Sequence, residues 1–234
     1  MKRKKQAISL AAGAIALAAA QSASASLVYL QSETFSGTGL GSVSTVLTLQ
    51  SPAGTSTEAG SVAFNGSADI LTGNTQAQNA TVSLGQLGSS SASDLRIVFN
   101  AVEPGPQSSV TLASLVLTIY SPTGALLFSS GAFTSITFPA PVGNGIGNSG
   151  FLFGLDAAQA AQAQLLAYSG PFANNRIGLL ASVSDAQGGI ETFFVGTTGN
   201  GVDSALPVSE PATLALLGLA FGGAALGGRR RKPA

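Results

Sequence analysis

The fold class of this chain is decided by the stretch Ser114-Leu-Val-Leu-Thr-Ile-Tyr-Ser-Pro-Thr-Gly-Ala-Leu-Leu-Phe-Ser129. Leu115, Leu117 and Ile119 recur at every second position, which is the pattern of a strand with one buried face. Pro and Gly then occupy the second and fourth positions of the turn 121–124. The stretch therefore predicts an antiparallel hairpin made of strands 114–120 and 125–129.

The same alternation recurs elsewhere and predicts further strands. It is clearest at residues 94–100 and 176–184. The Gly-containing loop Asp185-Ala-Gln-Gly-Gly189 predicts that strand 176–184 forms a second hairpin with strand 190–195. Other candidate strands lie at residues 27–34, 43–50, 61–71, 80–84 and 135–138.

A single helix near 156–168 is expected among these strands. Asp156, with Gln159 three residues later, resembles a capping box, and Gly170-Pro171 ends the Ala- and Gln-rich stretch that follows. Many short strands, frequent Gly and Ser turns and one helix favour an all-β fold, a β-sandwich of jelly-roll type. A β-helix is the second choice because the strands lack a constant spacing.

The charged residues are segregated along the chain. The formal net charge is zero, but four basic residues stand at 2–5 and four more at 229–232. Residues 26–208 keep two arginines against nine acids, a net charge of −7. An acidic body without lysine excludes nucleic-acid binding. The chain has no cysteine, so disulfides do not stabilise it.

Residues 1–25 have the three parts of a secretory signal peptide. A basic start is followed by an apolar region at 7–20, which is shorter than the ~17 to 25 residues that span a bilayer. The region ends in Ala23-Ser-Ala25, so we expect signal peptidase to leave Ser26 as the mature N-terminus. An uncleaved anchor helix is the alternative.

The C-terminal residues 208–234 also combine three features. Ser209-Glu210-Pro211 precedes an uncharged apolar run at 212–228, which as a helix is about 25 Å long and just spans a bilayer. The basic cluster Arg229-Arg230-Arg231-Lys232 follows, and the positive-inside rule places it in the cytoplasm and the acidic body outside. We therefore expect a transmembrane helix at 212–228, joined to the body by a linker at 199–207.

This tail, about residues 207–232, closely resembles the PEP-CTERM sorting signal, with Ser209 in place of the motif's first proline. The resemblance implies recognition by an exosortase, a membrane-embedded transpeptidase-like enzyme of bacteria that make exopolysaccharide. Processing would release the body or transfer it to the envelope or matrix. The motif is also labelled an ice-binding protein C-terminal domain, but the threonines form no regular array, so no ice binding is expected. An ordinary tail anchor with basic flanks is the alternative.

The residue types that are missing exclude most catalytic sites. Without histidine or cysteine, the usual zinc sites and catalytic triads cannot form, and the body has no lysine for Schiff-base chemistry. Only carboxylates remain for acid–base catalysis, and they are scattered singly. The nine acids of the body are Glu33, Glu58, Asp69, Asp94, Glu103, Asp156, Asp185, Glu191 and Asp203. We therefore predict no catalytic residues and no enzyme.

Two glycine-rich segments raise the question of a cofactor. Gly145-Ile-Gly-Asn-Ser-Gly150 has the spacing G-x-G-x-x-G, but no helix is expected directly after it, so we interpret it as a flexible loop rather than a dinucleotide site. Gly199-Asn-Gly-Val-Asp203 is the nearest candidate for Ca²⁺, a weak one with a single carboxylate. Apart from this calcium candidate, no cofactor or metal is expected.

The sequence thus predicts an exported cell-surface or extracellular-matrix protein whose β-sandwich domain spans 26–198. Its expected role is structural, adhesive or exopolysaccharide-associated, as in a biofilm. The expected partners are signal peptidase, an exosortase and the inner membrane through 212–228, with exopolysaccharide as a further candidate. The rival hypotheses are a secreted carboxylate-dependent polysaccharide hydrolase and a soluble ligand-binding module.

Overall fold

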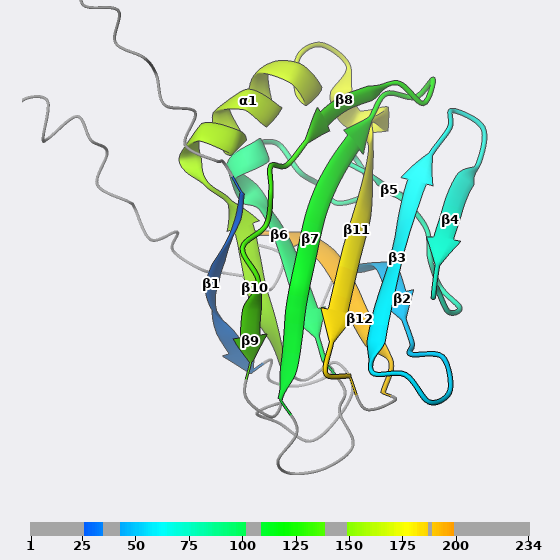
Figure 1. Ribbon diagram of the computed structural model, residues 1–234. Helices are drawn as coiled ribbons and strands as arrows, with labels where there is room; N and C mark the ends of the chain where they lie inside the picture. The colour runs from blue at the N-terminus through cyan, green and yellow to red at the C-terminus, as the bar shows by residue number, and fades with distance from the viewer. Residues whose placement is uncertain (1–25, 35–42, 102–108, 139–148, 187–188, 199–234) are drawn as a thin grey trace, which may run out of the picture.

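Two antiparallel β-sheets pack face to face in the computed structural model, which describes residues 26–34, 43–101, 109–138, 149–186 and 189–198 (Figure 1). Sheet A has the order β1 (Leu27–Thr34), β10 (Ser149–Leu155), β6 (Leu95–Asn100), β12 (Glu191–Thr197), β2 (Ser44–Leu49). Sheet B has the order β4 (Asp69–Gly73), β3 (Thr57–Phe64), β11 (Arg176–Ser184), β7 (Val110–Tyr120), β8 (Leu126–Ser129). In addition, β5 (Val82–Ser83) pairs with β11, and β9 (Ile136–Phe138) pairs with β7. The predicted all-β sandwich is confirmed, while its jelly-roll subtype stays a prediction.

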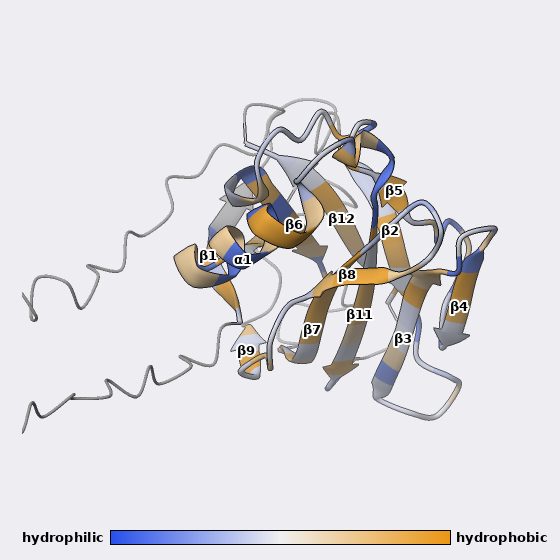
Figure 2. Ribbon diagram, turned by 90° about the horizontal axis from the view of Figure 1, so that it is seen from above, coloured by the Kyte–Doolittle hydropathy of each residue, from blue (hydrophilic) through white to orange (hydrophobic). Residues whose placement is uncertain are grey.

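The hydrophobic core lies between the sheets, which form two layers when viewed from above (Figure 2). Phe99 of β6 and Phe193 of β12 stack there, with ring centroids 4.8 Å apart. Leu115 and Leu117 of β7 reach the core from the other sheet and are fully buried. Each such side chain contributes about 1.5–3 kcal/mol through burial. The alternation in the sequence therefore identified the inward face of β7 correctly.

The hairpin predicted from 114–129 is confirmed, although β7 begins earlier, at Val110. The backbone N–H of Gly124 donates to the carbonyl of Ser121 over 3.0 Å, and Gly124 has φ +83°. Glycine adopts this left-handed conformation more easily than other residues, because it has no Cβ. The residues of this turn therefore explain why β7 pairs with β8.

The single strand predicted at 61–71 is wrong, because two strands and a turn occupy this region. Strands β3 and β4 pair as an antiparallel hairpin. The side-chain Oδ1 of Asn65 accepts hydrogen bonds from the backbone of Ser67 and Ala68, and Gly66 has φ +92°. Asn-Gly is a strong turn signal. Here it outweighs the apolar residues on either side.

The second predicted hairpin is also wrong in its pairing. Both strands exist, but β11 lies in sheet B between β3 and β7, whereas β12 lies in sheet A between β6 and β2. The connection at 185–190 therefore passes from one sheet to the other. Alternation shows which face of a strand is buried, but it does not identify the neighbouring strand.

Strand β10 was not predicted, because the end of the glycine segment 145–150 was interpreted as a flexible loop. Gly150 instead belongs to β10 and stands opposite Glu33 of β1. A Cβ on Gly150 would lie 2.4 Å from Cγ1 of Val98, so the glycine makes room for that side chain. A strand rather than a helix follows these glycines, which contradicts a dinucleotide site.

The predicted helix is confirmed as α1 (Ala157–Ala167), which packs against β8 and the 3-10 turn Ala92–Asp94. Asp156 is its N-cap and accepts a hydrogen bond of 2.8 Å from the backbone N–H of Gln159. Such a cap contributes about 1 kcal/mol.

The predicted terminal segments lie outside the described residues. They are the signal peptide at 1–25, the linker at 199–207 and the transmembrane span at 212–228. Within the part of the chain that the structure describes, no helix has the length and apolarity needed to cross a membrane. The domain bounds therefore stay predictions.

Candidate functional site

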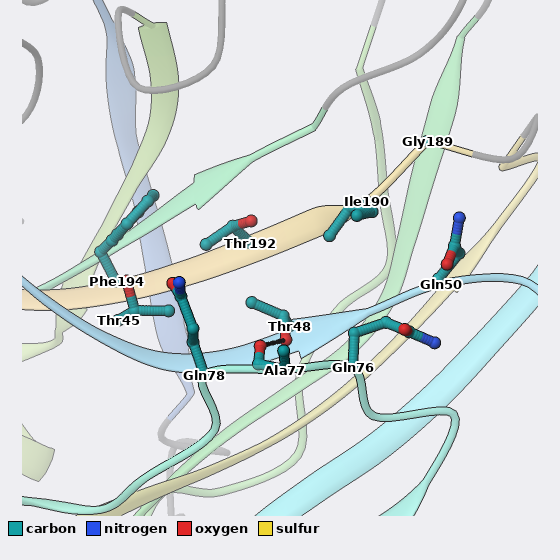
Figure 3. A pocket seen from close by; sticks show the side chains of 10 residues that line it. All are labelled: Thr45, Thr48, Gln50, Gln76, Ala77, Gln78, Gly189, Ile190, Thr192 and Phe194. Carbon is teal, nitrogen blue, oxygen red and sulfur yellow. Dashed lines mark hydrogen bonds between the residues drawn. The ribbon is translucent and has the colours of Figure 1, made fainter.

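A groove of about 680 Å³ opens on the face of sheet A that points away from the core (Figure 3). Phe193 and Val195 of β12 belong to the core, so Thr192 and Phe194 point outward by strand alternation. Strands β2 and β12 form the floor, and residues 76–78 form one wall. Ten described residues line the groove: Thr45, Thr48, Gln50, Gln76, Ala77, Gln78, Gly189, Ile190, Thr192 and Phe194.

The wall belongs to a segment that runs along the outer edge of β2. The backbone N–H of Gln76 donates to the carbonyl of Thr48 over 3.0 Å, and that of Ala80 donates to the carbonyl of Val46 over 3.3 Å. These bonds act as an irregular extra strand. They cover backbone groups that an exposed edge strand would otherwise present for aggregation.

Thr48 and Asn79 complete the attachment of the wall to the floor. The backbone N–H of Thr48 donates to Oδ1 of Asn79 over 2.6 Å. The hydroxyl of Thr48 donates to the carbonyl of Ala77, also over 2.6 Å (Figure 3). Thr48 itself is 5% exposed, and both bonds are partly buried. The hydroxyl of Thr48 is therefore used by the fold.

The described residues that line the groove are all uncharged. Gln50, Gln76 and Gln78 each offer an amide with two N–H donors and one carbonyl acceptor. No hydrogen bond among the described residues occupies these three side chains. Ile190 and Phe194 add apolar surface. The groove can therefore receive a neutral polar ligand that also has an apolar face.

Phe194 is held in place by a small apolar cluster on the same outward face. It packs against Val98 of β6 and Leu152 of β10, which are both fully buried. Leu30 and Val43 join this cluster. The aromatic ring at the groove is thus supported by the sheet beneath it.

Gln78 has a backbone conformation that is unusual for its residue type. Its φ is 70°, in the left-handed region, at a cost of about 1–2 kcal/mol for a residue with a Cβ. The only other described non-glycine residue with a positive φ is Asp185, at 64°. Strain of this kind tends to gather at binding sites. One of the two strained non-glycine positions of the described chain therefore lies in the wall at 76–78.

Both arginines of the body are engaged in the fold. Nη1 of Arg96 donates to the carbonyls of Ser93 and Leu95 over 2.7 and 2.8 Å. Burial lowers the pKa of Arg96, and the nearby Asp94 opposes that shift. Nε of Arg176 donates to the hydroxyl of Thr81 over 2.6 Å. Neither guanidinium lines the groove.

The acids that sequence analysis left as possible catalytic groups do not appear among the described residues of the groove. Glu58 and Glu191 are buried, at 1% and 0% exposure, and Oε1 of Glu58 accepts from the backbone and hydroxyl of Ser51. Asp156 caps α1, and Asp69 accepts from the backbone of Thr81 over 3.1 Å. These four acids therefore have structural partners or lie in the interior.

Most residues of the processing predictions lie outside the described part of the chain, as does the calcium candidate 199–203. The exception is Ser26, which directly precedes β1. Among the described residues, no group of three or more Asp and Glu side chains is placed to hold a metal ion. The undescribed residues of these predictions are Ala23 and Ala25, Asp203, Ser209, Glu210 and Pro211, and Arg229, Arg230, Arg231 and Lys232. Glu103, one of the acids of the body, also lies outside the described residues.

The C-terminal tail is the part of the chain that comparison with known proteins identifies. Residues 207–232 match the PEP-CTERM protein-sorting motif. The resemblance drawn from the sequence is thereby confirmed over the same residues. The PEP-CTERM motif supports an exported protein that an exosortase processes and that is sorted to the cell envelope. No curated protein and no solved structure matches the chain.

Sequence analysis did not predict the groove. Its residues come from three separated segments, 45–50, 76–78 and 189–194, which only the sheet topology brings together. None of them belongs to a motif. The available signal was compositional, since Gln76-Ala77-Gln78 stands between predicted strands with no turn or core role assigned to it.

Proposed function

We propose that this chain is a non-enzymatic cell-surface or extracellular-matrix protein with a structural, adhesive or exopolysaccharide-associated role. The observation that carries the proposal is the PEP-CTERM motif at 207–232, which follows an acidic β-sandwich. The precursor is anchored in the inner membrane through 212–228, with its body outside. Exosortase processing then delivers the body to the envelope, surface or matrix.

The groove supports a binding role over a catalytic one. Its described lining has amides, hydroxyls and apolar groups but no carboxylate, and the chain has no histidine, cysteine or body lysine. A polysaccharide hydrolase needs two carboxyl groups about 5 to 9.5 Å apart on either side of its substrate. The residue types of the chain and the lining of the groove together therefore favour a module that holds a ligand.

Cell fractionation tests the proposal. Immunoblots against the sandwich should show the chain in the inner membrane of an exosortase-deficient strain, and in the extracellular matrix of the parent strain. Replacing Glu210 and Pro211 by Ala should retain the chain in the inner membrane of the parent strain as well. Ser209→Ala is the matched control, because it leaves both motif residues in place.

Two results would contradict the proposal. One is an inner-membrane location in both strains, which would indicate a permanent anchor. The other is release of the chain into the medium without sedimentation with the exopolysaccharide, which would remove the matrix-associated role.

A further inference from the structure

We propose that the groove on sheet A binds a segment of a neutral polysaccharide. This inference rests on the proposed function, because it names the ligand class and the site of a matrix-associated protein. The volume of about 680 Å³ lies within the range of ordinary ligand sites, roughly 300–1,000 Å³.

The hydrogen-bonding groups of the groove match the hydroxyl groups of a sugar. A hydroxyl both donates and accepts, and so does each side-chain amide of Gln50, Gln76 and Gln78. These amides have no partner among the described residues, so they are available to a ligand. The apolar face of a sugar ring, formed by its C–H groups, can lie on Phe194.

The charges of the body favour a neutral polymer over an acidic one. The described lining is uncharged, and residues 26–208 have a net charge of −7. The guanidinium groups of Arg96 and Arg176 are bonded within the fold. An anionic polysaccharide would therefore meet repulsion without a compensating cation in the groove.

The closed edge of β2 disfavours a peptide as the ligand. Extended peptides commonly bind by adding a strand to an open sheet edge, where main-chain hydrogen bonds supply the affinity. Here the segment 74–80 already bonds to β2, through Gln76, Ala80 and the side chain of Asn79. The ligand must therefore be recognised by side chains, as the amides and Phe194 allow.

The wall at 76–78 already has a fixed conformation in the absence of ligand. The bond between Thr48 and Asn79 fixes its position, and the left-handed backbone of Gln78 fixes its direction. The side chain of Gln78 projects from the wall on the same side as Thr45 and Phe194 (Figure 3). A preformed site loses less conformational entropy when it binds.

Binding to immobilised polysaccharides tests the inference. The full chain is purified in detergent from the exosortase-deficient strain and applied to dextran, mannan, the exopolysaccharide of the producing strain and, as the acidic polymer, alginate. The chain should be retained on at least one neutral polymer and not on alginate. Phe194→Ala should weaken that binding about 10-fold. Gln78→Gly should weaken it about 3- to 10-fold, the range for one hydrogen bond.

Two variants far from the groove are the matched controls. Leu180→Ala removes a side chain that is 44% exposed on β11 in sheet B, and Gln162→Ala removes an exposed amide on α1. Both should bind like the parent chain. Circular dichroism checks that each variant is folded. Gln78→Gly keeps the test valid if Phe194→Ala does not fold, because glycine adopts the backbone conformation of residue 78 without strain.

The inference is overturned if the parent chain binds neither dextran nor mannan nor the exopolysaccharide, if it prefers alginate, or if both groove variants bind like the controls. These failures differ from failure of the proposed function. A chain that sediments with the exopolysaccharide in culture, whatever its groove variant, retains the proposed function and loses only this site. A chain that never reaches the matrix contradicts the proposed function itself.

Discussion

The backbone N–H of Thr48 lies 2.6 Å from Oδ1 of Asn79, so a side chain supplies the acceptor that a neighbouring strand would normally provide. This one contact has two consequences. It helps to close the edge of sheet A, where β2 would otherwise present free backbone groups. It also fixes the wall of the groove to its floor. The stability of this edge and the shape of the candidate site therefore depend on the same residue.

Asn79→Ala should lower the free energy of unfolding by about 1–3 kcal/mol, because it leaves a largely buried N–H without an acceptor. Asn79→Asp keeps an oxygen at Oδ1 that can accept from Thr48, but it replaces the donor Nδ2 by a second acceptor that faces the carbonyl of Gln76, so it should lose stability through repulsion there instead. Urea denaturation of both variants measures the difference. A loss of less than about 0.5 kcal/mol in Asn79→Ala would show that this acceptor oxygen does not stabilise the edge.

Gly124→Ala should destabilise the chain more than Gly54→Ala. Both glycines have left-handed backbones, with φ of +83° and +80°, so each alanine costs about 1–2 kcal/mol in strain. At Gly54 a Cβ meets nothing within 4 Å, whereas at Gly124 it would lie 2.2 Å from the carbonyl carbon of Asn65. The clash adds about 1–3 kcal/mol. Thermal unfolding of the two variants compares them. Similar losses would mean that the turns at 65–68 and 121–124 can move apart.

The sequence predicted best the features that depend on local chemistry. The hairpin of β7 and β8 and the N-cap Asp156 each need only a few neighbouring residues. The pairing of β12 with β2 and β6 was missed, because it depends on residues far apart in the chain. The groove was missed for the same reason.

Strand β10 was missed for a different physical reason. It is buried on both faces: Phe153 belongs to the core, and Leu152 belongs to the cluster on the outward face. A strand covered on both sides has no alternation of apolar and polar residues. Its sequence, Phe151-Leu-Phe153 after glycines, therefore shows none of the periodicity that marked β7.

The stability of the chain should fall as the pH rises above about 10, the ordinary pKa of tyrosine. Burial raises the pKa of Tyr168, which is 5% exposed and lies 2.7 Å from the hydroxyl of Ser89, a bond that partly opposes the shift. The folded chain therefore holds this proton at pH values where the unfolded chain has lost it. The loss approaches about 1.4 kcal/mol per pH unit.

Tyr168→Phe tests the origin of this pH dependence. The variant has no phenolic proton, so its free energy of unfolding should fall less steeply between about pH 10 and pH 12 than that of the parent chain. Urea denaturation at a series of pH values measures both slopes. An unchanged slope would assign the effect to another group.

Gln78→Gly should make the chain more stable and the groove less able to bind. Glycine removes the left-handed strain at φ 70°, and its greater freedom in the unfolded chain offsets part of that gain, which leaves about 0.5–1 kcal/mol. Asp185→Gly, at φ 64° outside the groove, is the matched control. It should gain less, because aspartate adopts this conformation more readily, and it should bind neutral polysaccharide like the parent chain.

Urea denaturation and the binding assay are run on the same preparations. A loss of binding in a more stable protein cannot come from unfolding, so it would assign the side chain of Gln78 to the ligand. No gain in stability at position 78 would show that the backbone there is not strained.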